Sequence, residues 1–427
     1  MDKLTPHQEV KLRECVGHPY VHLKAPAGAG KTFVALNCIL TVLTGKPDPL
    51  TGKPATVLFA ACNLALCLFV ARWLCRRIKN TLLRASALRR LHIIFLPFEQ
   101  GPQSLSVERG RIERTPVGMQ VRKPIHDGES SGAHNSRPSG ARQRDYSLVV
   151  IDEAHHVFSH HSAAIAKYIP VSTDKMLLSD INQATKAGIN WPEGDAKEVL
   201  LTEVVRSSKR IVAGSGAFQL AVDEVTSHHA AEGPPLKAFI FDRPDTSTEG
   251  MSALYMAYAE HVIKALEHTM KLIGEISLHD RVAVVVPDAA FADGLRPTLD
   301  YALFRRWPQR AFELIDPMEA AASAINQPSG NSSGNVLKED SRSEGFLDRD
   351  RSEEWIVVSP IDDFDGLERL IVIACGLDSV IDDATVGDQS SFEDRGRIYR
   401  ALTRARAAIA LESAPLRPAY TVPEGHP

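Results

Sequence analysis

Short apolar runs alternate with longer stretches of helical periodicity along the first half of the chain. Runs without polar interruption predict strands at 20–24, 55–61, 92–97, 147–152, 175–180 and 198–203. Helices are expected from Lys31 onward and over 63–79. Strands that are apolar at every position are covered on both faces, and strand–helix alternation builds parallel sheets. The pattern therefore predicts an α/β fold with a parallel sheet flanked by helices.

The same pattern starts again after about residue 215. Strand-like runs follow at 236–241, 281–287, 311–316, 354–360, 369–376 and 407–413, with helical stretches at 249–273 and 391–405. A chain of 427 residues is longer than one hydrophobic core usually serves. We therefore expect two α/β domains of similar size, covering residues 1–215 and 216–427.

Two polar segments interrupt this alternation. Residues 126–144 are rich in Ser, Gly and Arg, and residues 326–354 are rich in Ser, Asn and charged side chains. Neither segment carries enough apolar surface to offset the entropy lost on ordering. Both are expected to be disordered surface insertions, one in each predicted domain.

Charge and cysteine content narrow the class of protein. With 49 Lys+Arg and 53 Asp+Glu, the formal net charge is −4, so no chain-wide basic field indicates nucleic acid, although a local groove could still be basic. The six cysteines form no CxxC pair and lie mostly in apolar segments, which favours reduced thiols in the cytoplasm or nucleus. The polar N-terminus and short apolar runs predict no signal peptide and no membrane partner.

The stretch "APAGAGKT" at 25–32 lies between a predicted strand and a predicted helix. This is the setting of a phosphate-binding loop, in which glycines let backbone N–H groups approach phosphate oxygens. The lysine would neutralise the β- and γ-phosphates of ATP, and the threonine hydroxyl would coordinate Mg²⁺. The predicted ATP-binding residues of this loop are Gly28, Ala29, Gly30, Lys31 and Thr32.

An acidic pair ends the predicted strand in "LVVIDEAHH". Asp152 is expected to hold Mg²⁺, and Glu153 to orient or deprotonate the attacking water. Thr32 and Asp152 are thus the predicted metal ligands.

Eight segments in order along nearly the whole chain resemble the motifs of superfamily 1 helicases. The segments are "LTPHQ" (4–8), "APAGAGKT" (25–32), "VLFAACNLAL" (57–66), "VVIDEAH" (149–155), "LLSDINQ" (177–183), "LTEVVRSSKRIV" (201–212), "DDFDGLERLIVIACGL" (362–377) and "RIYRALTRARAAIAL" (397–411). The resemblance implies two RecA-like domains, hydrolysis of ATP with Mg²⁺, and a single-stranded DNA or RNA partner.

Further site residues are implied by the same resemblance. Gln8 would read the adenine base, and Glu368 would contact the ribose. Gln183 and Arg206 would join Glu153 at the reacting phosphate. Arg404 would act as an arginine finger, reaching the γ-phosphate from the second domain.

The residues expected to contact nucleic acid depart from the family pattern. The aromatic residues expected after the segment at 177–183 are absent, and Trp191 is the one tryptophan nearby. Asn63 is the one matching residue in the segment at 57–66, and Asp365 replaces a lysine, which reverses the charge. Two hypotheses follow: a nucleic-acid-dependent translocase or helicase, and an ATP-driven switch that moves a protein partner without unwinding. A small-molecule kinase would explain neither the second domain nor the segment at 397–411.

Overall fold

The computed structural model describes residues 3–47, 49, 52–108, 111–112, 121–122, 145–170, 173–180, 189–216, 218, 226–227, 231–242, 244, 246–274, 277–325, 354–377 and 389–413. Gln183 lies outside the described residues, as do segments 126–144 and 326–353, so the predictions made for them stay predictions.

The first half of the chain forms a mostly parallel sheet. In sheet order its strands are β10 (Lys197–Leu200), β1 (Tyr20–Ala25), β9 (Asp174–Asp180), β8 (Leu148–Ile151), β2 (Val57–Ala61), β3 (Leu91–Phe95), β4 (Gln103–Leu105) and β7 (Val121–Arg122). Every pair from β10 to β3 is parallel, whereas β4 and β7 add an antiparallel edge that the apolar pattern did not predict.

Helices cover both faces of this sheet. One face packs against α2 (Lys31–Thr44), α3 (Leu64–Arg77) and α4 (Thr81–Arg89), and the other against α5 (Ala154–His160) and α6 (Ser162–Ala166). Successive residues of one strand serve opposite faces: in β2, Phe59 joins the first core, and Leu58 and Ala60 join the second. This arrangement explains why central strands such as β2 are apolar at every position.

The second half forms a sheet of parallel strands. Its order is β13 (Lys237–Ile240), β18 (Ala405–Ser413), β17 (Arg369–Cys375), β14 (Val282–Val286), β16 (Glu354–Pro360) and β15 (Phe312–Ile315). One face carries α8 (Thr246–Ile273) and α9 (Ala289–Arg306), and the other carries α7 (Lys209–Gly216), α10 (Pro317–Ile325) and α11 (Gln389–Thr403). The predicted α/β fold with two parallel sheets flanked by helices is confirmed.

Four short strands and one helix complete the described elements. β5 (Val107–Glu108) pairs with β6 (Arg111–Ile112), and β11 (Glu203–Val204) pairs with β12 (Thr226–Ser227). Helix α1 (Pro6–Cys15) packs against α2 and β10.

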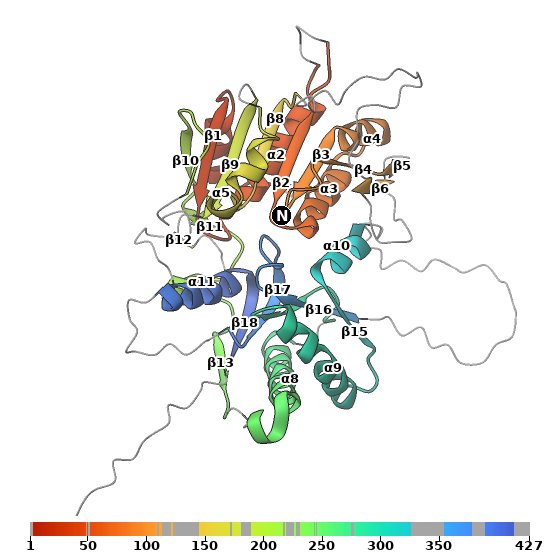
Figure 1. The fold of residues 1–427 in the computed structure, drawn as a ribbon, viewed down its shortest axis with the longest axis vertical. Helices are drawn as coiled ribbons and strands as arrows, with labels where there is room; N and C mark the ends of the chain where they lie inside the picture. Colours follow the sequence, from red (N-terminus) through yellow and green to blue (C-terminus); the bar gives the residue numbers. More distant parts are fainter. Residues whose placement is uncertain are drawn as a thin grey trace, which may run out of the picture.

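The two halves of the chain contact each other at two places, one at α3 and α10 and one at Ser207 and Ala405. Figure 1 shows the two sheets one above the other, with α10 next to α3 and α11 below the first sheet. Ser207 Oγ donates to the carbonyl of Ala405 at 3.0 Å, and α7 then packs on α11 and β18.

The second predicted disordered insertion, residues 326–354, was given a C-terminal boundary one residue too late. Glu354 is the first residue of β16, and its carboxylate accepts hydrogen bonds from the Leu278 N–H at 2.6 Å and from Arg310 at 2.6 and 2.7 Å. Glu354 follows a polar, charged run and looks like part of it in the sequence. Its partners Leu278 and Arg310 are distant in the sequence, so only the fold shows that it is ordered.

Candidate functional site

The predicted phosphate loop lies between the end of β1 and the start of α2. Gly28 and Gly30 have φ of 78° and 91°, a conformation that favours glycine. A Cβ on Gly30 would lie 2.5 Å from Gln8 Nε2, so the loop also needs glycine for space. Lys31 is buried, and its Nζ donates to the carbonyls of Ala25 and Pro26 at 3.2 and 3.5 Å. The ammonium therefore lies across its own loop.

Helix α1 brings Gln8 to this loop. Thr5 caps the helix by accepting from the Gln8 N–H at 3.2 Å, and Gln8 Oε1 accepts from the Thr5 N–H at 3.1 Å. The Gln8 side chain is buried, and its Nε2 donates to the carbonyl of Ala29 at 2.9 Å. Both ends of the amide are thus engaged, one by the helix cap and one by the phosphate loop.

The acidic pair meets the loop at the carboxyl end of β8. Thr32 Oγ1 donates to Asp152 Oδ2 at 2.8 Å, and the Glu153 N–H donates to Asp152 Oδ1 at 2.9 Å. Glu153 has φ of 47°, which is uncommon outside glycine and directs the chain into α5. Burial and the neighbouring Glu153 charge raise the pKa of Asp152, whereas Thr32 and Lys31 oppose the increase.

Arg404 reaches this pair from the second sheet, where α11 gives way to β18. One of its terminal nitrogens lies 3.3 Å from Glu153 Oε1 and 3.2 Å from Asp365 Oδ1. The side chains of all three residues are 9 to 11% exposed. Burial alone would raise the pKa of Glu153, but Arg404, His155 and Lys31 outweigh it and lower that pKa. Glu153 is therefore held as a carboxylate by a cation from the other half of the chain.

Two buried polar atoms at this contact have no hydrogen-bond partner among the described residues. They are Glu153 Oε2 and Arg404 Nε. His155 Nδ1 lies 3.7 Å from Glu153 Oε2, which is longer than a hydrogen bond. Buried polar groups are usually satisfied, and exceptions are found where a ligand or water acts. The pair thus has hydrogen-bonding capacity that the described residues leave unused.

A second ion-pair group lies beside the first. The Glu368 carboxylate pairs with Arg206 and accepts from Arg406 at 3.1 Å. Arg206 also lies near the loop: its Cβ would be 4.0 Å from a Cβ on Gly28. The structure therefore brings the predicted residues Arg206 and Glu368 together, with Glu368 bound to arginines.

Sequence reasoning missed three residues of this cluster. Asp365 accepts from Arg404 and also from Arg400, so it sits between two guanidinium groups. Its signal was visible as the reversed charge in "DDFDGLE", and Arg400 lies one helical turn before Arg404. His155 accepts from the Asp180 N–H at 3.4 Å and lies beside Glu153, so it links the helicase-like segments at 177–183 and 149–155.

The residues noted for nucleic-acid contact have other roles here. Trp191 packs on His22 and Phe158, with ring centroids 4.5 and 5.9 Å apart. Asn63 caps α3 by accepting from the Leu66 N–H at 2.8 Å, and its amide donates to the carbonyl of Asp365 at 2.9 Å. Trp191 thus belongs to the core of the first sheet, and Asn63 bridges the two halves.

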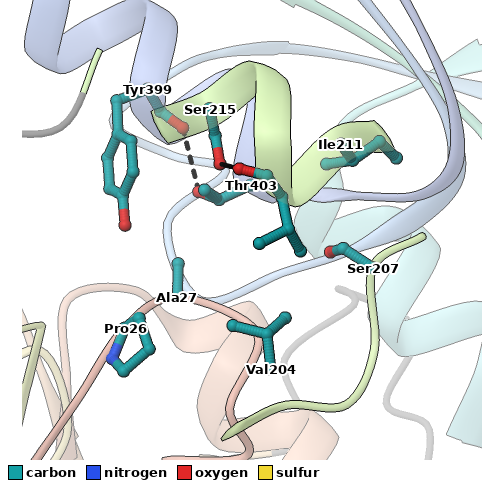
Figure 2. Close-up of a pocket in the computed structure, with 9 residues that line it drawn as sticks. Pro26, Ala27, Val204, Ser207, Ile211, Ser215, Tyr399 and Thr403 are labelled. Carbon is teal, nitrogen blue, oxygen red and sulfur yellow. Dashed lines mark hydrogen bonds between the residues drawn. The ribbon is translucent and has the colours of Figure 1, made fainter. Parts of the chain in front are cut away.

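A small hollow opens between the start of the phosphate loop and the second half of the chain. Figure 2 shows Pro26 and Ala27 facing Tyr399 and Thr403 of α11, with Ser215 of α7 above. No charged side chain lines this hollow, and it has room for about one water molecule. The two halves are therefore in close contact at the start of the loop.

Comparisons with known proteins leave the family open. No protein-family model matches the chain, and no curated protein matches it. Among solved structures, the chain is similar to the C-terminal domain of a possible DNA helicase from Lactobacillus plantarum WCFS1. The match has 12% identity and a TM-score of 0.27, and it covers 49% of this chain and 86% of the other.

The described residues also bear on membranes and metals. None of their helices is long and apolar enough to cross a membrane. They contain no group of three or more His, Cys, Asp or Glu side chains placed to hold a metal ion. An oxygen pair such as Thr32 and Asp152 suits Mg²⁺, which takes few protein ligands and shares substrate phosphates.

Proposed function

We propose that the chain is an ATP hydrolase of the superfamily 1 helicase type, with two RecA-like domains divided near residue 215 and activity that depends on nucleic acid. The observation that carries the proposal is the contact between Arg404 and Glu153, 3.3 Å across the two halves and beside the Thr32–Asp152 pair. A phosphate loop, an acidic pair and an arginine from a second sheet are the parts that ATP hydrolysis between two domains requires.

Binding of ATP is assigned to the loop and the helix that follows it. The backbone N–H groups around Gly28 and Gly30 and the start of α2 would hold the phosphates. Lys31 would exchange its carbonyl partners for phosphate oxygens. Thr32 and Asp152 would hold Mg²⁺, which neutralises phosphate charge when it is bound with ATP.

Hydrolysis is assigned to Glu153 and Arg404. Glu153 accepts a proton from water as the water oxygen bonds to the γ-phosphorus and the bond to the bridging oxygen breaks. Arg404 stabilises the charge that develops on the phosphoryl oxygens. In the state described here these two residues bind each other, so the γ-phosphate must draw Arg404 away before Glu153 can act as a base.

The test is phosphate release by the purified protein, alone and with single-stranded DNA or RNA. We expect ATP turnover that nucleic acid increases, and no turnover from Lys31→Ala. Lys46→Ala, which removes an exposed lysine just after α2, is the matched control and should behave as wild type. Turnover by Lys31→Ala at the wild-type rate would contradict the proposal.

An ATP-driven switch acting on a protein is the second candidate, and one observation favours it. The turn around Asp365 also carries Asp362 and Asp363, and it faces Asn63 at the junction of the two halves. Asp362 and Asp365 already engage Arg400, and the third carboxylate, that of Asp363, repels a phosphate backbone. ATP turnover that neither DNA nor RNA changes would select this candidate.

A further inference from the structure

Residues 49–98 differ from the rest of the chain in charge. They contain eight Lys or Arg and no Asp or Glu. Because the whole chain has a formal charge of −4, the remaining residues carry −12. Protein surfaces ordinarily intersperse both signs, so a segment of this length with one sign needs a reason.

Some of these cations are used inside the fold. Arg90 donates to the carbonyls of Ala55 and Leu43, both at 2.7 Å, and Arg84 donates to the carbonyl of Ile78 at 3.2 Å. Arg72 lines a hollow between α3 and α10. Arg84 and Arg90 thus join elements, and all three side chains are half-buried rather than exposed.

Five cations are exposed: Lys53, Arg76, Arg77, Lys79 and Arg89. Lys53 precedes β2, and the other four lie on α3 and α4 or between them. None of these four forms an ion pair with a carboxylate of the described residues. We call these four the α3–α4 basic face. Arg76 and Arg77 end α3, Lys79 lies between α3 and α4, and Arg89 ends α4, so the four lie on or between two short helices that pack on each other.

The fold places this face away from the candidate ATP site. Helix α3 starts after the carboxyl end of β2 and runs back, and Arg89 lies just before β3, which is parallel to β2. The basic face therefore lies at the amino edge of the first sheet, whereas the phosphate loop follows the carboxyl end of β1. Figure 1 shows α4 on the outer side of α3, with the second sheet below.

We propose that the α3–α4 basic face binds the phosphate backbone of nucleic acid. Three of its four cations are arginines, whose planar donors match phosphate oxygens. The inference rests on the proposed function for its nucleic-acid partner and names a second contact region outside the junction. A contact region outside the junction is needed because the turn at the junction of the two halves carries Asp362, Asp363 and Asp365, and the negative charge of Asp363 disfavours a phosphate backbone there.

The test measures binding of labelled single-stranded and duplex oligonucleotides by fluorescence anisotropy, without ATP, over a series of salt concentrations. The variant replaces the four cations: Arg76→Gln, Arg77→Gln, Lys79→Gln and Arg89→Gln. The control removes four exposed lysines elsewhere: Lys197→Gln, Lys237→Gln, Lys264→Gln and Lys271→Gln. Both variants lose four positive charges, so a difference in their affinity for the oligonucleotides shows that the location of the charges matters.

We expect the control to bind like wild type and the basic-face variant to bind at least about tenfold more weakly. Four lost phosphate contacts lower the slope of log K against log salt by roughly 3 to 4. Equal binding by the two variants would overturn the proposal. So would tighter binding of a polyglutamate peptide than of either oligonucleotide, which would assign the face to an acidic protein. Because ATP is absent, these results do not depend on whether the chain hydrolyses it.

Discussion

Replacing Arg404 with alanine tests whether the second half of the chain completes the candidate active site. The guanidinium links Glu153 and Asp365 at 3.3 and 3.2 Å, and its side chain is only 9% exposed. Thr32, Lys31 and the loop backbone belong to the first half and can hold ground-state ATP without it. We therefore expect Arg404→Ala to affect the transition state much more than ATP binding.

The size of each effect follows from this geometry. Arginine fingers are worth on the order of 10³ or more in rate, because their contact strengthens as charge develops on the phosphoryl oxygens. Loss of the ground-state contact should weaken ATP binding by about tenfold or less, since Arg404 also gives up two carboxylate partners to reach the phosphate. The assay compares single-turnover hydrolysis with equilibrium binding of a non-hydrolysable ATP analogue.

Stability must be measured on the same variant. Arg404→Ala leaves the buried Glu153 carboxylate without a cation at hydrogen-bond distance, and breaking a buried pair costs about 3–5 kcal/mol. Arg404→Lys keeps the charge and lowers this cost, yet its single ammonium lacks the planar donor set, so hydrolysis should stay slow. Arg305→Ala breaks an exposed pair with Glu260 and serves as the control, with an expected loss below about 1 kcal/mol.

One result would refute this account of Arg404. If folded Arg404→Ala hydrolyses ATP at nearly the wild-type rate, the arginine is only a structural tie between the halves.

Three other outcomes are expected. Glu153→Gln should bind ATP but hydrolyse it at least about 100-fold more slowly, because a general base is lost; unchanged single-turnover rates would contradict this role. Binding of Mg²⁺–ATP should weaken as the pH falls, since burial and the Glu153 charge raise the pKa of Asp152 and a protonated carboxyl is a poor metal ligand; calorimetry across pH 5 to 8 checks it, and an equal pH dependence in Asp152→Asn would contradict it. Glu354→Ala should lower the free energy of unfolding by about 2–3 kcal/mol in denaturant titrations, because its charged hydrogen bonds to Leu278 and Arg310 are lost.

The last of these effects also depends on pH. The carboxylate pKa of Glu354 lies below its ordinary value of 4.5, because hydrogen bonds from Arg310 and Leu278 outweigh burial. A depressed pKa contributes stability that is present above the unfolded value and lost as pH falls through the folded one. The difference between Glu354→Ala and wild type should therefore shrink below pH about 4.5.

Most of the fold was predictable because the local pattern and the tertiary structure agree. Strands buried on both faces are apolar at every position, so the runs at 55–61 and 281–287 became β2 and β14 with little change. The antiparallel edge was not predictable in this way. β4 and β7 have three and two residues, too short to show any period.

The candidate site likewise contains features that local sequence predicts and features that depend on tertiary contacts. The phosphate loop and Asp152 follow from local sequence, because one turn and one strand end contain all that they need. Asp365 could be noticed but not interpreted, since its partners Arg400 and Arg404 come from a different element. The engagement of Gln8 with Ala29 was equally hidden, because it depends on how α1 packs against the loop.

Helix α3 connects the two proposals. Its first residues meet the turn of Asp365, which holds Arg404, and its last residues are Arg76 and Arg77 of the basic face. The helix has 14 residues and is about 21 Å long. A rigid helix of this length can transmit a displacement at one end to the other, provided that the turn has two positions.

Asn63 is the side chain through which such a displacement would pass, because its amide donates to the Asp365 carbonyl at 2.9 Å. Asn63→Ala should leave nucleic-acid binding as in wild type while reducing the stimulation of ATP turnover by nucleic acid. The variant also loses a helix cap, worth about 1 kcal/mol. Asn80→Ala controls for that loss, since Asn80 caps α4 by accepting from the Leu83 N–H at 3.0 Å and forms no hydrogen bond to the turn in the described part of the chain. If the two variants are stimulated equally, α3 does not couple the basic face to Arg404, and stimulation must reach the site by another route.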